Sequence, residues 1–304
     1  MIGVYRPVAH RLALATLAAT AVLIVLGGLV TNTGAALAVP DWPSTFGHNM
    51  FLFPWSRMVG GVFYEHSHRL AGALVGLLTV ALAAALWREG GRLRLLGLVA
   101  VAVVLAQGVL GGLRVVLLQD TLAIIHGSLA PVFFALLAAL SMLTSPRGRV
   151  AAASLDPALK GLTVVTAALV YVQIVFGALV AHAGPLDLHL AGAVLVFAFV
   201  PIVTVRMRRT TDAVAAPIAT LLLVLLGVQL VLGVGLLLAR FSSVPVFAGQ
   251  VAAVLLPVVH RLAGSLVLAA AVVLAVRAST AVTHALLAQA EPGGGTGGAR
   301  VCRQ

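Results

Sequence analysis

Eight mostly apolar stretches follow one another along the 304-residue chain. They cover approximately residues 10–30, 62–86, 95–117, 121–143, 159–181, 187–205, 214–239 and 255–276. A helix of roughly 20 apolar residues is long enough to cross the hydrocarbon core of a bilayer. With 62% hydrophobic and 9% charged residues, the chain is too apolar for a soluble domain of its size. We therefore predict an all-α integral membrane protein with eight transmembrane helices and no soluble module.

The basic residues are distributed unevenly between the loops that join these helices. If the N-terminus is cytoplasmic, 14 of the 19 Lys and Arg residues lie on the inner side. Inner loops of membrane proteins carry such an excess, so we predict that both termini are inside. The same distribution accounts for the net charge of +11, and we expect membrane lipid rather than nucleic acid as the surroundings.

Short segments recur along the chain. "HRLAGALVG" at 68–76 resembles "HRLAGSLVL" at 260–268, and "HGSLAPVFFALL" at 126–137 resembles "HLAGAVLVFAFV" at 189–200. A third motif occurs three times, as "AQGVLGGL" at 106–113, "VQIVFGALV" at 172–180 and "VQLVLGVGLLL" at 228–238. Recurrence of this kind indicates that the chain contains an internal repeat.

The repeat predicts two halves of four helices each. The N-terminal half spans 1–150 and includes a long outer loop at 31–61, and the C-terminal half spans 151–280. Because four is an even number, both halves have the same orientation, related by a pseudo-two-fold axis along the membrane normal. A Gly-rich cytoplasmic tail at 281–304 is expected to be flexible.

Four histidines, His68, His126, His189 and His260, begin the even-numbered predicted helices. All four helices run from outside to inside, so the imidazoles are expected at a similar depth. Imidazole pairs on facing helices of a bundle can supply both axial ligands of a haem iron. We predict haem ligation; the alternative is a set of hydrogen-bonded core histidines. Zinc is less favoured, because no carboxylate or thiolate accompanies the C-terminal pair.

Charged residues lie next to two of these histidines. Arg69 and Arg261 directly follow His68 and His260, where a guanidinium could bind a haem propionate or extend to the membrane surface. Glu65 precedes His68 by three residues, so the two share a helix face. No acidic residue stands at the corresponding position before the other three histidines. Intramembrane carboxylates are usually functional, so we predict a catalytic role; the alternative is a glutamate satisfied by water or Arg69.

With these features in place, the sequence resembles the haem A synthase family over about residues 10–277. The resemblance rests on the Glu-x-x-His-Arg motif at 65–69, "PDWP" at 40–43, His126, His189 and "HRLAG" at 260–264. It implies oxidation of a ring methyl of haem O to a formyl group, giving haem A for terminal oxidases. It also implies that His68 and His126 hold the substrate haem O, that His189 and His260 hold haem B, and that Glu65 is the catalytic carboxylate.

One departure concerns the first outer loop, where many members of that family carry a cysteine pair. Here Val39 and Ser44 flank the Asp-Trp motif, and the single cysteine of the chain is Cys302. A disulfide or thiol role for the loop is thereby excluded within one chain.

The resemblance further implies contact with a haem O synthase and a terminal oxidase, in a bacterial plasma membrane. The electron donor stays open, and homo-oligomerisation is compatible with the sequence. Two other functions stay open as well. A di-haem b-type electron-transfer subunit would keep the four histidines but leave Glu65 without a role. A non-catalytic assembly factor that delivers haem differs from the enzyme only in not needing Glu65.

Overall fold

The computed structural model describes residues 7–150, 156–242 and 249–290, and this part of the chain contains helices but no strand. The long helices are α1 (Pro7–Asn32), α2 (Gly60–Trp87), α3 (Gly91–Leu117), α4 (Asp120–Thr144), α6 (Pro157–Ala181), α7 (Leu186–Arg208), α8 (Ala215–Phe241) and α9 (Gly249–Ala290). All eight are long and apolar enough to cross a membrane. The predicted all-α fold with eight transmembrane helices is confirmed.

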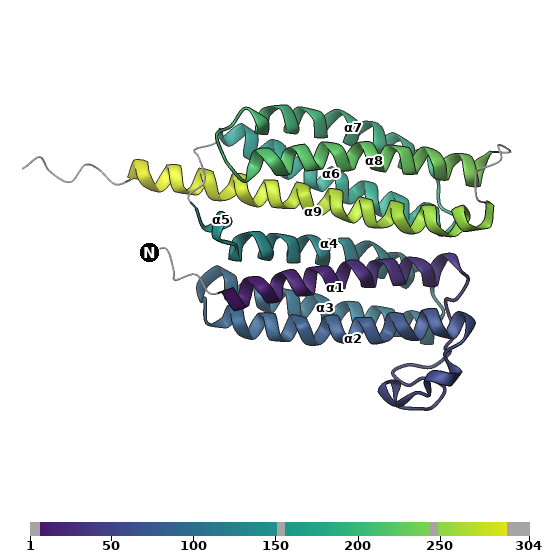
Figure 1. Ribbon diagram of the computed structural model, residues 1–304. Helices are drawn as coiled ribbons and strands as arrows, with labels where there is room; N and C mark the ends of the chain where they lie inside the picture. Colours follow the sequence, from purple (N-terminus) through teal and green to yellow (C-terminus); the bar gives the residue numbers. More distant parts are fainter. Residues whose placement is uncertain (1–6, 151–155, 243–248, 291–304) are drawn as a thin grey trace, which may run out of the picture.

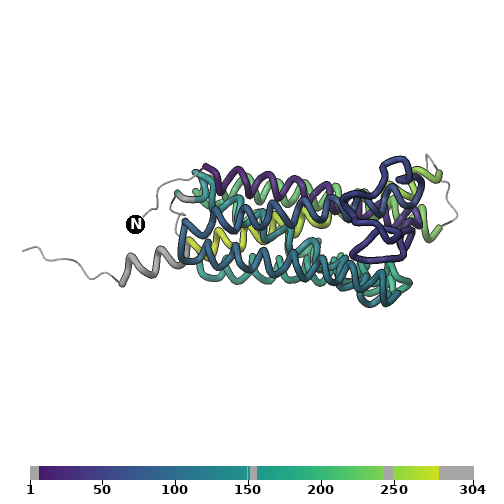
Figure 2. The backbone as a smooth tube through the Cα atoms, turned by 90° about the horizontal axis from the view of Figure 1, so that it is seen from below, coloured from purple at the N-terminus to yellow at the C-terminus, as the bar shows by residue number. Residues whose placement is uncertain are grey.

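The long helices form two four-membered rings that lie side by side (Figure 1). All of these helices run roughly along one common direction (Figure 2). In the first ring α1 packs on α2, α2 on α3, α3 on α4, and α4 returns to α1; α6, α7, α8 and α9 repeat this order in the second. The rings meet through α4 and α9, with α1 against α9 and α4 against α6 on either side. Exchanging α1–α4 with α6–α9 leaves these contacts unchanged, which is consistent with the predicted two-fold relation.

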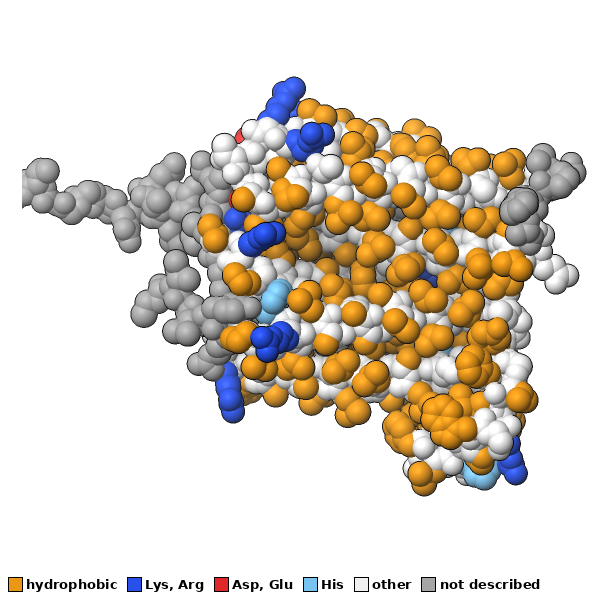
Figure 3. All heavy atoms as spheres, in the orientation of Figure 1, with side chains coloured by type: hydrophobic (Ala, Val, Ile, Leu, Met, Phe, Trp, Pro, Cys, Tyr) orange, Lys and Arg blue, Asp and Glu red, His pale blue; other side chains and the backbone are white. Residues whose placement is uncertain are grey.

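Close approach of α1 to α9 helps to join the rings. A Cβ atom at Gly28 would lie 3.2 Å from the side chain of Val258, so only a glycine fits there without displacement. Ile24 and Phe134 of the first ring belong to the same buried apolar cluster as Leu268 of α9. Apolar side chains also cover much of the outer surface between the helix ends, as expected for a lipid-facing protein (Figure 3).

The two ends of the bundle differ in character. The segment 33–59, with the short 3-10 helices η1 (Met50–Leu52) and η2 (Trp55–Arg57), projects from one end, which we call the outer end (Figure 1). Most of the visible Lys and Arg side chains gather at the opposite, inner end (Figure 3). Helix α9 continues to Ala290, so the segment predicted as a flexible tail begins within this helix; residues 291–304 lie outside the described part.

A buried ion pair holds the inner end together where the halves are connected. The guanidinium of Arg277 in α9 contacts the carboxylate of Asp212, with Nη2 3.0 Å from Oδ2. Its Nη1 donates to the carbonyls of Gly148 and Val150, next to the short helix α5 (Pro146–Arg149). Asp212 also accepts from the N–H of Ala215, which begins α8. One arginine thus joins α9 to the connection between the halves and to the start of α8.

Candidate functional site: two pairs of histidines

The four predicted ligands form two pairs, one in the interior of each ring. The ring centroids of His68 and His126 are 6.5 Å apart, with an angle of 87° between the planes. Those of His189 and His260 are 6.4 Å apart, at 68°. His68 and His126 come from α2 and α4, His189 and His260 from α7 and α9, so each pair spans diagonally opposite helices of its ring. All four lie within the first twelve residues of their helices at the outer end.

The separation within each pair matches two imidazoles on opposite sides of one metal ion. With metal–nitrogen bonds of about 2 Å and roughly 1.2 Å from each nitrogen to its ring centre, the centroids would be about 6.4 Å apart. Both observed separations agree with this value. The donors are neutral nitrogens in an apolar bundle, which suits haem iron.

Each imidazole also lies against a glycine of the preceding helix. A Cβ atom added at Gly27, Gly111, Gly177 or Gly233 would lie 3.0, 3.2, 3.1 or 3.3 Å from Cε1 of His68, His126, His189 or His260 respectively. The same contact thus occurs in all four helical hairpins. Larger side chains at these positions would push the imidazoles out of place. The bundle therefore provides four equivalent histidine positions.

One buried ring nitrogen lacks a partner. Within the described residues, Nδ1 of His260 is buried and forms no hydrogen bond, whereas the imidazole of His68 lies at the backbone of Leu23. A buried polar atom without a partner is unfavourable, and it usually indicates a missing group. Together with the centroid separation and the glycine contacts, it shows that the residues present fit a haem in each ring.

Glu65 lies one helical turn before His68 and is almost fully buried, with 5% of its surface exposed. One carboxylate oxygen, Oε1, pairs with Nη2 of Arg69 at 2.9 Å. The other, Oε2, accepts the backbone N–H of Val39 at 2.9 Å. One carboxylate oxygen is therefore bound to the arginine and the other to the outer segment 33–59.

Arg69 binds the same segment through its two terminal nitrogens. Nη1 donates to the carbonyls of Asp41 and Ser44, at 2.7 and 3.0 Å, and Nη2 donates to the carbonyl of Val39 at 2.9 Å. This arrangement differs from both predicted roles, the propionate contact and extension to the membrane surface. The guanidinium fastens the outer segment to α2, because its fork of donors matches three converging carbonyls.

Two further side chains complete the contact between the outer segment and the first ring. Nδ1 of His66 lies 3.2 Å from the hydroxyl of Thr45, and its ring packs on the ring of Phe53. The indole of Trp42 lies directly on Gly112 of α3, where a Cβ atom would overlap it. Gly112 follows Gly111, the glycine that contacts His126. The segment thus packs on the outer parts of α2 and α3, next to the helices that hold the first histidine pair.

Asp41 shapes the turn that presents these carbonyls to Arg69. Burial alone would raise the pKa of Asp41, but hydrogen bonds from the N–H of Gly47, the hydroxyl of Ser44 and the N–H of Phe46 lower it from 3.8 to about 2. The carboxylate is therefore ionised at neutral pH, and the three hydrogen bonds that it accepts hold the turn together.

Arg261 directly follows His260 on α9. Among the described residues its guanidinium forms no hydrogen bond or ion pair, although its backbone carbonyl accepts from Ser265. Arg114 at the end of α3 is near enough for the two positive charges to interact. The sequence did not single out Arg114, because its position along α3 does not reveal that its charge lies near that of Arg261.

Sequence analysis predicted no role for three glutamines, although they belong to the segment that recurs along the chain. Gln107, Gln173 and Gln229 each precede one of the histidine-contacting glycines by four residues, which is the spacing in the repeated segment. Their amide nitrogens contact His126, His189 and His260 respectively.

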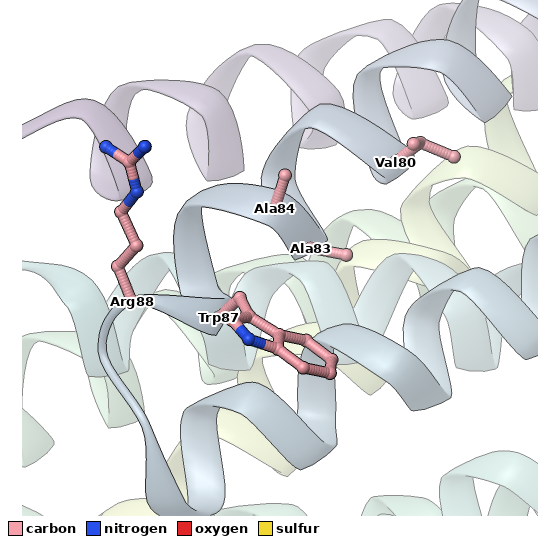
Figure 4. A pocket seen from close by; sticks show the side chains of 5 residues that line it. All are labelled: Val80, Ala83, Ala84, Trp87 and Arg88. Carbon is pink, nitrogen blue, oxygen red and sulfur yellow. The ribbon is translucent and has the colours of Figure 1, made fainter.

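A shallow surface hollow lies elsewhere. It is lined by Val80, Ala83, Ala84, Trp87 and Arg88 at the inner end of α2, opposite the end that carries His68 (Figure 4). The guanidinium of Arg94 lies over the ring of Trp87, 5.1 Å from its centre. An indole beside arginines is typical of the membrane–water boundary, so we do not regard this hollow as the functional site.

Fold and site thus define a class: helical membrane proteins with two imidazole pairs inside four-helix bundles. Residues 10–185 match the model of the cytochrome oxidase assembly protein family. The chain belongs to this family and is a multi-pass membrane protein, as predicted for a bacterial plasma membrane.

Among curated proteins, the chain is similar to the heme A synthase of Shouchella clausii (strain KSM-K16). The two are 32% identical over 180 residues, which cover 57% of this chain and 58% of that protein. The family match includes Glu65, His68 and His126 but ends before His189 and His260. The geometry of the second ring is therefore an independent argument for the second pair.

Proposed function

We propose that the chain is a haem A synthase, which oxidises a ring methyl of haem O to a formyl group to supply terminal oxidases with haem A. The observation that carries this proposal is the pair of matching imidazole sites, each at the separation of a two-histidine haem centre. In this account His68 and His126 would hold haem O, the substrate. His189 and His260 would hold haem B, which would supply electrons when bound.

Glu65 distinguishes the two sites chemically. It lies one turn from His68, and no acid precedes His126, His189 or His260 at the same spacing. A carboxylate so placed can accept a proton from the substrate carbon's oxidation intermediates, or stabilise positive charge that develops beside it. The ion pair with Arg69 and the N–H of Val39 hold it in a defined position.

Other residues border the substrate site. Trp42 of the outer segment packs on Gly112, next to the glycine that contacts His126. Arg261 is the better candidate for binding a haem propionate, because Arg69 is already bound to the outer segment. The partners in this account are haem O, membrane lipid, a haem O synthase and a terminal oxidase.

A di-haem electron-transfer subunit is the second candidate. It would place its haems at different depths to carry electrons across the membrane. The four histidines instead occupy the outer part of their helices, and a buried Glu65 would have no work in such a protein.

The proposal is tested by complementation of a bacterium that lacks its own haem A synthase but keeps its haem O synthase. Expression of this chain should restore the absorption of haem A in the membranes, and His68→Ala should abolish it. Membranes that contain only haem O and haem B, with the chain expressed and inserted, would contradict the proposal.

A further inference from the structure

We propose that Arg114 and Arg261 together bind the propionate carboxylates of the haem held by His68 and His126. One residue of the second half would then complete the site of the first half. Adjacency in the sequence would instead assign Arg261 to the haem of the second pair, because it directly follows His260. The assignment rests on the proposed function and names the side chains that bind the charged end of the substrate.

Arg261 lies on the face of α9 that packs against the first ring. Val258, three residues earlier, is in contact with α1: a Cβ atom at Gly28 would lie 3.2 Å from its side chain. Residues three apart share one face of a helix, so Arg261 lies on the side of the first ring as well. His260, by contrast, lies against Gly233 of α8, inside the second ring. These two neighbours in the sequence therefore face different rings.

Arg114 lies on the face of α3 that contacts the first pair. Gly111, three residues earlier, is the glycine that lies against His126. Because α3 runs toward the outer end, Arg114 lies about one turn further out than this contact. The residues at the corresponding position after the other three histidine-contacting glycines are Val30, Val180 and Leu236. An arginine at this position is thus specific to the first pair, as Glu65 is.

The two guanidiniums lie close to each other and to the first pair. Their positive charges are near enough to interact with one another, and both act on His126. The charge that acts on His260 is instead that of its partner His189. The arginine charge is therefore concentrated beside the first pair, although Arg261 comes from the second half.

No protein anion neutralises this pair of charges. In the described part of the chain, neither guanidinium forms a hydrogen bond or an ion pair. The carboxylate of Asp120, at the start of α4, is exposed and lies 3.8 Å from Nδ1 of His182 instead. Both arginines are only partly exposed, and like charges that share such a place repel each other unless an anion lies between them. The arrangement therefore calls for an anionic ligand.

The carboxylates of a bound haem suit this need. A haem carries two propionates, and the guanidinium of arginine binds a carboxylate through two parallel hydrogen bonds. Arg69, the other arginine beside this pair, already donates to three carbonyls of the outer segment. Arg114 and Arg261 thus remain to bind the charged end of the haem, while its apolar ring suits the interior of the bundle.

The test compares ferric haem B with its dimethyl ester, in which both carboxylates are blocked. In full-length His189→Ala the first pair remains as the haem site, and binding in detergent is followed by the Soret absorbance. Arg114→Gln and Arg261→Gln should each weaken the binding of haem B roughly tenfold or more. Binding of the ester should stay unchanged, which shows in the same variant that the site is folded.

Further variants decide which site the arginines serve. In the His68→Ala background, which keeps the second pair, Arg261→Gln should leave the affinity for haem B unchanged. Arg261→Lys keeps the charge without the fork of donors, so it should recover part of the affinity of the first site. Arg240→Gln, at an exposed arginine of the outer end of α8, is the matched control and should change neither site.

Three results would overturn the inference. A loss of affinity in the His68→Ala background alone would assign Arg261 to the second haem. Equal losses for haem B and its ester would make the arginines structural, and unchanged affinities would show that they bind no carboxylate. The proposed function survives each of these results. It fails if the wild-type protein binds haem O but never oxidises it, a result that would leave the role of the arginines intact.

Discussion

Glu65 and Arg69 form a 2.9 Å ion pair, and both also bind the backbone of Val39, one at its N–H and the other at its C=O. The buried carboxylate one turn before the predicted ligand His68 is thus tied to the outer segment. The position of the outer segment and the position of the carboxylate are coupled, because a movement of one changes the hydrogen bonds of the other.

Arg69→Met should release the outer segment from α2. The change removes the bonds to three carbonyls and to Glu65, and hydrogen bonds to a charged group contribute about 1.5–3 kcal/mol each. We expect amide hydrogen exchange in residues 38–48 to accelerate at least tenfold, while the second half of α2 is unchanged. Arg57→Met, at an exposed arginine of the same segment, is the control. Equal exchange in both variants would contradict this role of Arg69.

The turn around Asp41 should be sensitive to acid. Its pKa is lower in the folded protein, about 2, than the ordinary value of 3.8, so ionised Asp41 stabilises the turn. This contribution is complete above about pH 4 and is lost as the pH falls from 4 toward 2. Fluorescence of Trp42, in a background with Trp55→Phe and Trp87→Phe, should change in this window. Asp41→Asn should remove the step, and a step that persists in Asp41→Asn would assign it to another group.

The glycines beneath the imidazoles offer closely matched comparisons. In Gly233→Ala the new methyl group would press on Cε1 of His260, whereas a Cβ atom at Gly227 on the same helix meets nothing within 4 Å. Alanine favours the helix in both, so helix propensity does not explain a difference. We expect Gly233→Ala to lose the haem of the second site and Gly227→Ala to keep it, measured as haem per protein. Equal haem content would show that the contact does not position the ligand.

The inner ion pair should contribute strongly to stability. Arg277→Met leaves the carboxylate of Asp212 buried beside α8, and breaking a buried pair costs about 3–5 kcal/mol. The thermal unfolding temperature in detergent should fall clearly relative to Arg208→Met, an exposed arginine at the same end. A double change, Arg277→Met with Asp212→Leu, should recover part of the loss, because no unpaired charge remains. A full loss in the double variant would point to the helix-capping role of Asp212 instead.

The long helices could be predicted because the membrane sets their length, and each appears in the sequence as an apolar stretch of that length. The same topology predicted a similar depth for the four histidines, and the family resemblance implied which of them pair. Which helix of the first half corresponds to which helix of the second could not be predicted from the sequence. Sequence similarity relates His68 to His260, whereas the helix contacts relate α2 to α7, which carries His189. Every hairpin carries the same glycine–histidine contact, so short motifs match across hairpins as well as across halves.

The contacts of the outer segment could not be predicted from sequence. Arg69 binds backbone carbonyls, which every residue has, so no side-chain pattern in 39–44 reveals them. The glutamines were missed for a different reason. Their spacing to glycine is present in the sequence, but a Gln in an apolar helix acquires meaning only when its neighbour across the hairpin is known.

Glu65→Gln separates the catalytic role from the structural one. The amide oxygen of a glutamine can still accept the N–H of Val39, so the outer segment should stay in place, while the charge and the proton-accepting capacity are lost. We expect haem to stay bound and product formation to stop, with hydrogen exchange at Val39 near that of the wild type. Full activity in this variant would exclude Glu65 as the catalytic group.

The central claim, that the first pair of histidines holds a haem which the protein oxidises, is tested most directly by extraction. The chain is expressed with a haem O synthase, purified, and its haems are identified by mass spectrometry. The account predicts haem B together with haem A or its hydroxymethyl precursor, and it predicts haem B with unaltered haem O in Glu65→Gln. Haem B alone in both sites of the wild type would contradict the account and favour an electron-transfer protein.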